Sequence, residues 1–457
     1  MLWTLRPLRA WTLPSRLPQR SFSFTPNDRL PRVLTASVPK PPTLREQVAK
    51  AKKLPSFTDA VRNVPIRNQI LFVIAGTIGS LVVGAHLTNY ELAKWWAYIA
   101  SKPHDGLLRS RPPTSEELMR AKYNAFGRRL QGALATLKSS MEQLPETVKA
   151  MVVWSYVQVF QPILNASEGK RMCWAIGAVN VAVWLAWRVP RWNAFMYRAF
   201  SHNPLTGKSY TMLTSTFSHE NFFHLAFNCM ALASFGGAAS QQLMLLHKKV
   251  EGEKGLLSEP TPKWHLLALF ISAGLFASLV SHIGYVRWRY PRLIARLKSE
   301  GPSSSLRSGP SAAPHSAASA SASASASTAA SETALSAASA ASREAPHSLG
   351  SSGAIYAMVV ISALGFPDAE VTLVIPPWYP INIQTAVGAL LALDLLGVLR
   401  GWRLFDHFAH LGGAAFGAFW YAYGAKIWYE IRAWDLPVAY FFHGQNLKNA
   451  YKSSSSQ

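Results

Sequence analysis

Polar side chains stand inside the most apolar segments of this sequence, and one of them is a serine flanked by small residues. Ser352 lies in Gly350-Ser351-Ser352-Gly353, at the predicted start of a helix. A hydroxyl there has open space around it, and the free backbone N–H groups of a helix start suit a developing negative charge. The same pattern is also typical of tight helix packing in membranes.

A histidine follows in a later apolar segment. His410 would be expensive in a membrane span, so we expect it to be functional. Gly413 and Gly417 form a small-x-x-x-small face beside it, and a similar face follows Ser352, beginning at Gly353. Two helices that meet through these faces would bring the serine and the histidine together. A neutral imidazole could then accept the serine proton as a general base.

A further polar pair precedes both residues. His224 and Asn228 are spaced i, i+4 and therefore share one helix face. Both can donate to a developing oxyanion, and each such donor typically lowers the barrier by about 3–4 kcal/mol. Hydrogen bonding between helices and a metal site are the alternatives. No metal or cofactor is expected, because the histidines show no established ligand spacing.

Composition indicates a membrane protein. Hydrophobic residues make up 49% of the 457 residues and charged residues only 15%, against about 25% in soluble domains. Seven apolar segments could each form a transmembrane helix of about 20 residues. They are residues 70–87, 172–189, 222–246, 264–286, 350–366, 383–399 and 408–423.

The layout predicts an all-α polytopic protein with one helix followed by a core of six. We expect four parts, in which the second contains the first helix and a long polar loop, and the third is the six-helix core. Residues 151–164 are apolar but interrupted, which predicts an interfacial or packed segment. A Ser/Ala-rich stretch, 300–345, is expected to be a disordered loop inside the core. The four parts are residues 1–53, 54–171, 172–432 and 433–457.

The net charge of +23 is concentrated between the apolar segments. No nucleic-acid-binding signature accompanies it, which argues against a nucleic-acid partner. Residues 1–53 are rich in arginine and serine and poor in acids, as in mitochondrial transit peptides; a basic disordered tail is the alternative. A cut after Phe22 would match Arg20-Ser21-Phe22-Ser23. Lys and Arg in the loops favour an N-terminus in the matrix, and the two cysteines cannot build a disulfide framework.

Three motifs, which occur in order on the third, fifth and seventh segments, together resemble a rhomboid intramembrane serine protease. They are Ser-His-Glu-Asn-Phe-Phe-His-Leu-Ala-Phe-Asn, Gly-Ser-Ser-Gly-Ala-Ile-Tyr and Phe-Asp-His-Phe-Ala-His-Leu-Gly-Gly. The extra leading helix and the transit peptide resemble the mitochondrial inner-membrane, presenilins-associated rhomboid-like branch. The resemblance covers residues 172–432 and implies a multi-pass protein of the mitochondrial inner membrane.

The resemblance implies a Ser-His dyad, with Ser352 as nucleophile and His410 as general base. It also implies that His224, Asn228 and the Ser352 backbone N–H form the oxyanion hole, and that Tyr356 packs on the catalytic imidazole. The expected substrates are single-span or membrane-anchored mitochondrial proteins, such as a dynamin-like GTPase of inner-membrane fusion or imported precursors. A non-catalytic scaffold and a transporter are the alternatives.

Two acids near these motifs are left without an established role. Asp406 lies four residues before His410, so it could complete a triad, but we expect it at the helix mouth, bonded to a loop. Asp394 lies inside an apolar segment, where insertion of an acid costs about 2.5–3.5 kcal/mol. It should therefore face the bundle or a polar neighbour.

Overall fold

The computed structural model describes residues 66–101, 112–254, 257–299, 347–372, 379–402 and 405–437. The predicted transit peptide and the Ser/Ala-rich loop lie outside these residues, as does most of the predicted C-terminal part. Within the described ranges the chain is mostly helical.

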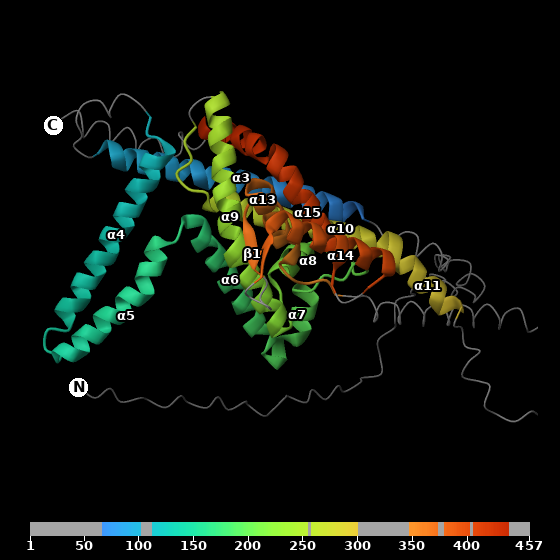
Figure 1. The fold of residues 1–457 in the computed structure, drawn as a ribbon. Helices are drawn as coiled ribbons and strands as arrows, with labels where there is room; N and C mark the ends of the chain where they lie inside the picture. Colours follow the sequence, from blue (N-terminus) through green and yellow to red (C-terminus); the bar gives the residue numbers. More distant parts are fainter. Residues whose placement is uncertain are drawn as a thin grey trace, which may run out of the picture. The chain divides into compact units, whose positions relative to one another are not determined.

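Each of the seven predicted apolar segments overlaps a helix (Figure 1). These helices are α3 (Arg67–Ala100), α6 (Glu168–Trp187), α9 (Phe222–Lys254), α10 (Lys263–Gly284), α13 (Ser352–Gly365), α14 (Ile383–Arg400) and α15 (His407–Phe419). The shorter helices are α7 (Asn193–Ala199), α8 (Thr211–Thr214) and α11 (Tyr290–Ser299), with 3-10 turns at Pro190–Trp192 and Ser215–Phe217 and π-helical turns at Tyr285–Arg289 and Trp420–Gly424. Strands β1 (Glu370–Thr372) and β2 (Pro380–Asn382) form a small antiparallel pair before α14.

Four of the described helices are long and apolar enough to cross a membrane: α3, α9, α10 with its continuation, and α14. A fifth span results if α6 and the 190–199 segment, which meet at a bend of 97°, are taken together. Helix α13 has 14 residues, or about 21 Å, which is shorter than the hydrocarbon core of about 30 Å. The fold is therefore that of a helical membrane protein, and the one-plus-six arrangement stays a prediction.

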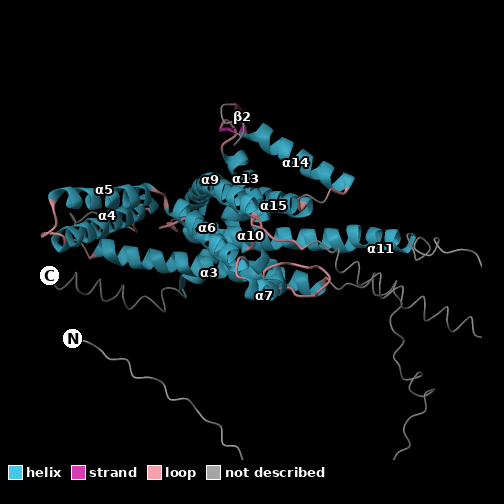
Figure 2. Ribbon diagram, turned by 90° about the horizontal axis from the view of Figure 1, so that it is seen from below, coloured by secondary structure: helices cyan, strands magenta, loops and turns pink. Residues whose placement is uncertain are grey.

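The stretch predicted as a long polar loop is instead largely helical. Helix α3 continues to Ala100, and α4 (Ser115–Ser140) and α5 (Glu146–Asn165) follow as a hairpin (Figure 2). A capping box explains the start of α4, because the side chains of Thr114 and Glu117 each bond the other's backbone N–H. Helix α5 has no buried residue, and the exposed Trp154 belongs to the segment predicted to be interfacial.

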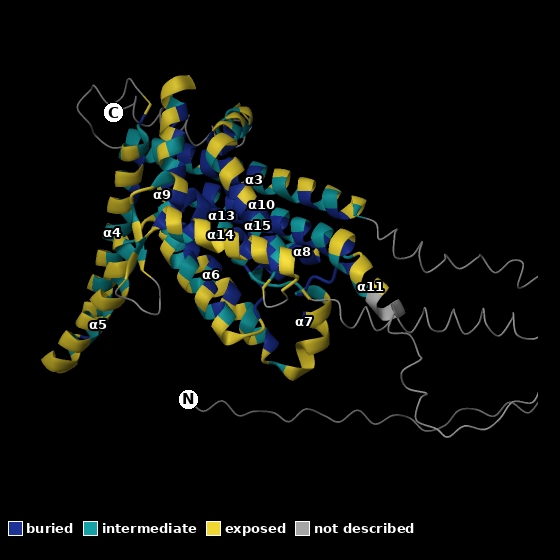
Figure 3. Cartoon of the chain, turned by 45° about the vertical axis from the view of Figure 1, so that its right-hand side comes forward, coloured by how far each residue is buried: buried dark blue, intermediate teal, exposed yellow. Residues whose placement is uncertain are grey.

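Helix α13 occupies the centre of the core and packs against α9, α10 and α15 (Figure 3). Its contact with α15 depends on glycine. A Cβ on Gly413 would overlap the Gly353 carbonyl oxygen, and one on Gly417 would lie 2.5 Å from the Ala357 carbonyl oxygen. Only glycine permits this approach of two backbones, which positions the first turns of both helices side by side.

A buried polar cluster ties the far end of the bundle together. Arg432, in the helical segment 425–437, is fully buried and donates to Asn89 on α3 and to the backbone carbonyl of Ser258 before α10. The buried Glu259 accepts a hydrogen bond of 3.1 Å from the Trp428 indole N–H. The hydrogen bonds of Arg432 thus join segments that are distant in sequence.

Candidate active site

Ser352 begins α13, and a glycine two residues earlier sets its position. Gly350 has a φ of +126°, a conformation that favours glycine. Its N–H donates to the carbonyl of Ser215, 2.9 Å away. A Cβ at Gly350 would lie 2.6 Å from the His224 ring, so the turn brings α9 and the start of α13 into close contact.

His410 on α15 lies beside Ser352. Its Nε2 atom is 2.9 Å from the Ser352 Oγ, a hydrogen-bond distance. The Tyr356 ring, one turn along α13, stacks on the imidazole with the ring centroids 4.3 Å apart and the planes 10° from parallel. His410 is buried, whereas Ser352 is partly accessible. The structure therefore brings together the three side chains that the sequence motifs associate with one another.

Asp394 lies on the other side of the imidazole. Its Oδ1 atom is 3.0 Å from His410 Nδ1 and 2.6 Å from His407 Nδ1. An ionised carboxylate only accepts hydrogen bonds, so both Nδ1 atoms carry a proton. The neutral tautomer of His410 then has its lone pair on Nε2, where it accepts a hydrogen bond from the Ser352 hydroxyl. Asp394 thereby selects the tautomer that a general base requires.

The sequence predicts a polar neighbour for Asp394 but does not identify which residue it is. Sixteen residues and the turn between α14 and α15 separate Asp394 from His410, so no helical spacing links them. The available signal is an acid in an apolar segment. Asp406, at the helix mouth as expected, caps α15 through the Ala409 N–H and accepts from two serine hydroxyls, Ser281 and Ser348.

His224 and Asn228 occupy the first turns of α9, next to the start of α13. The Asn228 Nδ2 atom donates to His219 Nε2 over 3.0 Å. His219 Nε2 also lies 3.4 Å from both the backbone N and the Oγ of Ser351. His219 was not predicted to belong to this constellation, because it precedes α9 and no helix periodicity connects it to Asn228.

Burial lowers the pKa of His219 to about 3. The imidazole is therefore neutral over the physiological range, which leaves a lone pair for the donors around it. Its neutral ring fills the space between α9 and the residue before Ser352. One hydrogen of the Asn228 amide is used here, and the second remains for another acceptor.

The carboxylate and histidines at this site could also be considered as metal ligands. Asp394, His407 and His410 offer ligand atoms within 4.8 Å of one another. Zinc bonds of about 2.0–2.1 Å would separate tetrahedral ligand atoms by about 3.3 Å. The two distances from Asp394 Oδ1, 2.6 and 3.0 Å, instead match hydrogen bonds. Proton sharing is the chemistry that this cluster fits.

Comparison with known proteins places these residues in a known domain. A family model for the Rhomboid domain matches residues 206–290 and 318–427. The helical core of this chain is thus similar to the Rhomboid domain. The first matched range contains His224 and Asn228, and the second contains Ser352 and His410. No solved structure gives a significant match to this chain.

The similar curated proteins are mitochondrial. The human presenilin-associated rhomboid-like protein, mitochondrial, is 29% identical over 280 residues, which cover 59% of this chain and 55% of that protein. Zebrafish (Danio rerio) presenilin-associated rhomboid-like protein A, mitochondrial, is 27% identical over 278 residues, covering 61% and 53%. Rhomboid protein 1, mitochondrial, of Saccharomyces cerevisiae is 27% identical over 256 residues, covering 55% and 53%.

The chain thus spans about half the length of the curated relatives it matches. These likenesses and the apolar helices identify this chain as a multi-pass mitochondrial membrane protein.

Proposed function

We propose that this chain is an intramembrane serine endopeptidase of the mitochondrial inner membrane, with Ser352 and His410 as its dyad. The observation that carries the proposal is the 2.9 Å contact between Ser352 Oγ and His410 Nε2. The serine begins a buried apolar helix, and the histidine is held in the required tautomer from behind. The match to the Rhomboid domain supports the same activity.

The first step is acylation. Ser352 Oγ attacks the scissile carbonyl carbon while its proton moves to His410 Nε2. The carbonyl oxygen becomes an oxyanion, stabilised by the Ser352 backbone N–H, the His224 ring and the free hydrogen of the Asn228 amide. His410 then gives its proton to the leaving amine as the C–N bond breaks. Water, deprotonated by the same imidazole, hydrolyses the acyl-enzyme and restores the serine.

Asp394 acts in this scheme as a positioning residue. It touches neither substrate nor serine, but its carboxylate holds the Nδ1 proton of His410 and faces the positive charge that forms on the ring. The buried carboxylate, with 3% of its surface exposed, exerts this effect with little screening by water. In this chain the Ser352–His410 dyad is thereby supplemented by an aspartate behind the histidine.

The substrates we propose are single-span or membrane-anchored mitochondrial proteins, such as a dynamin-like GTPase of inner-membrane fusion or imported precursors. A peptide carbonyl in an intact helix is already bonded in the i to i−4 ladder and is shielded from attack. A substrate helix must therefore unwind before cleavage. Residues that destabilise the substrate helix should increase the rate.

The site is proposed to open toward the matrix. Val73, near the start of α3, packs with Leu279, near the end of α10 that carries Ser281. The constellation therefore lies at the same end of the bundle as the start of α3, and loop charge favours the matrix for the N-terminus. Protease protection of a tag placed before α3, in mitochondria whose outer membrane has been opened, tests this orientation. Digestion of that tag without rupture of the inner membrane would contradict it.

The activity is tested with the purified full chain in liposomes and a single-span reporter. Ser352→Ala should abolish cleavage, and wild type but not the variant should be labelled by a serine-reactive phosphonate. Ser362→Ala is the matched control, because Ser362 is a buried serine of the same helix that bonds only backbone carbonyls. Cleavage by Ser352→Ala at the wild-type rate would contradict the proposal, and an unlabelled wild-type protein would favour a non-catalytic scaffold.

A further inference from the structure

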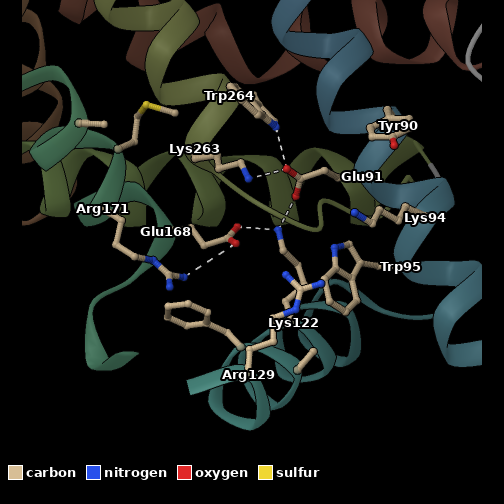
Figure 4. Close-up of a pocket in the computed structure, with 14 residues that line it drawn as sticks. Tyr90, Glu91, Lys94, Trp95, Lys122, Arg129, Glu168, Arg171, Lys263 and Trp264 are labelled. Carbon is tan, nitrogen blue, oxygen red and sulfur yellow. Dashed lines mark hydrogen bonds and ion pairs between the residues drawn. The ribbon is translucent and has the colours of Figure 1, made fainter. Parts of the chain in front are cut away.

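A cavity of about 480 Å³ lies between α3, α4, α6 and the start of α10 (Figure 4). Five basic side chains and two carboxylates line it, so its lining carries a net charge of +3. It is separate from Ser352, since it lies at the other end of α10. A concave site of this size is suited to a small ligand or a headgroup.

The two carboxylates, Glu91 and Glu168, form ion pairs with basic side chains at the floor of the cavity. The Lys122 ammonium is buried and lies 2.5 Å from Glu91 and 2.7 Å from Glu168. Lys263 lies 2.5 Å from the other oxygen of Glu91, and Arg171 lies 3.9 Å from Glu168. Figure 4 shows these side chains, which come from α3, α4, α6 and α10, converging on one another. The floor therefore holds more positive than negative charge and is preorganised by its ion pairs.

The mouth of the cavity carries two more cations. Lys94 on α3 and Arg129 on α4 are exposed, and neither forms an ion pair with another of the described residues. An adjoining smaller cavity shares both residues and adds Arg128. Two unneutralised cations over an electropositive floor attract an anion, and a guanidinium beside an ammonium is a common phosphate-binding combination.

The position of the cavity indicates the depth of the ligand in the membrane. It is formed by the C-terminal part of α3 and the N-terminal ends of α6 and α10, all of them apolar helices. Lys263 and Ser281 are 18 residues apart on α10, or about 27 Å, so the cavity and the constellation around Ser352 lie near opposite faces of the membrane. Trp95 and Trp264 line the cavity, and tryptophan is enriched at the level of lipid headgroups.

We propose that this cavity binds the phosphate group of an anionic glycerophospholipid. Lys94 and Arg129 bind the phosphate, and the floor cations contribute long-range attraction. Met172 and Ala175 of α6 also line the cavity and continue into the apolar part of that helix, which offers a path for the acyl chains. Basic pockets between membrane helices bind anionic headgroups in the same way.

The test uses the full chain in detergent, with native mass spectrometry to count bound phosphatidylglycerol or phosphatidylcholine. Wild type should bind phosphatidylglycerol roughly 25-fold more tightly than phosphatidylcholine, since each of the two basic residues at the phosphate contributes roughly a factor of five. The double variant Lys94→Gln, Arg129→Gln should lose most of this preference. The control Arg120→Gln, Lys138→Gln removes two exposed charges from α4 outside the cavity and should keep it.

Inorganic phosphate is the second arm and separates the two sources of the ligand. Thermal stabilisation of wild type by phosphate alone, without a preference for phosphatidylglycerol, would assign the cavity to a soluble phosphate and overturn the lipid proposal. Equal preference for phosphatidylglycerol in wild type and in the cavity variant would also overturn it. Melting of each variant in detergent without lipid shows whether it is folded.

Discussion

Two buried histidines in this bundle each lie beside a carboxylate and an aromatic ring, but only His410 is within hydrogen-bond distance of its carboxylate. His410 stacks on Tyr356 with centroids 4.3 Å apart, and its Nδ1 lies 3.0 Å from Asp394. His265 stacks on Trp428 at 4.2 Å, and its Nδ1 lies 3.8 Å from Glu259. A carboxylate and an aromatic face are thus common to both sites.

The difference that matters for the chemistry lies at Nε2. In His410 this atom faces the hydroxyl of Ser352, whereas in His265 it accepts the indole N–H of Trp420 at 3.2 Å. A hydroxyl can lose its proton and become a nucleophile, but an indole N–H only donates a hydrogen bond. Burial and a carboxylate partner therefore do not by themselves make a histidine catalytic; the group at its second nitrogen decides.

Replacing each histidine by alanine should separate the two roles most strongly. His410→Ala is expected to lower kcat by on the order of 10⁶, as when a serine protease loses its base, with little change in melting temperature. His265→Ala leaves the Trp420 N–H unpaired and should cost about 1–3 kcal/mol of stability, while kcat per folded molecule is retained. Reporter cleavage and thermal melting measure the two effects, and loss of kcat in folded His265→Ala would break the comparison.

Asp394→Asn tests the carboxylate on the catalytic side. The amide can no longer fix the tautomer or face the positive imidazole, so kcat should fall by about 10⁴-fold, as for the equivalent change in a serine protease. KM should remain near its wild-type value, because Asp394 does not touch substrate. A purely structural role would instead lower the melting temperature and leave kcat per folded molecule intact.

Arg432→Met tests the buried positive charge near His265, the histidine to which we assign a structural role. It removes the hydrogen-bond donor to Asn89 and to the Ser258 carbonyl and the nearby positive charge that attracts the buried Glu259. The loss should cost about 3–5 kcal/mol of unfolding free energy, measured by denaturation in mixed micelles. The double change Arg432→Met, Glu259→Gln should recover part of this loss. Lys426→Met, at an exposed position of the same helical segment, is the control and should be close to neutral. A fully stable single variant would contradict the structural role.

Gly413→Ala should have the smallest effect of the four. The added methyl meets the Gly353 carbonyl, and overpacking of this kind costs about 1–3 kcal/mol. Because the two helices must separate, Ser352 and His410 move apart and cleavage slows as well. Gly388→Ala on α14, where a Cβ meets no atom within 4 Å, serves as the matched control. Wild-type cleavage by a stable Gly413→Ala protein would remove the glycine contact from the mechanism.

Part of this architecture follows from residue types alone. Apolar segments long enough for helices are visible in the sequence, and a serine, a histidine and an Asn–His pair stand out inside them because polar groups are costly there. Their assigned catalytic roles stay predictions. Helix α4 was less visible, because its polar composition resembles a loop and its capping box is a short local signal.

What the sequence by itself determined is the set of apolar helices and the glycine faces at Gly353 and Gly413, since both depend on local composition and spacing. The tertiary structure alone decided which nitrogen of His410 meets which partner. Asp394 and Ser352 approach the ring from α14 and α13, and only the packing of both helices on α15 sets those contacts. Likewise, only packing turns basic residues scattered over α3, α4, α6 and α10 into one cavity. Contacts between distant segments arise from the way helices pack, which no short-range spacing encodes.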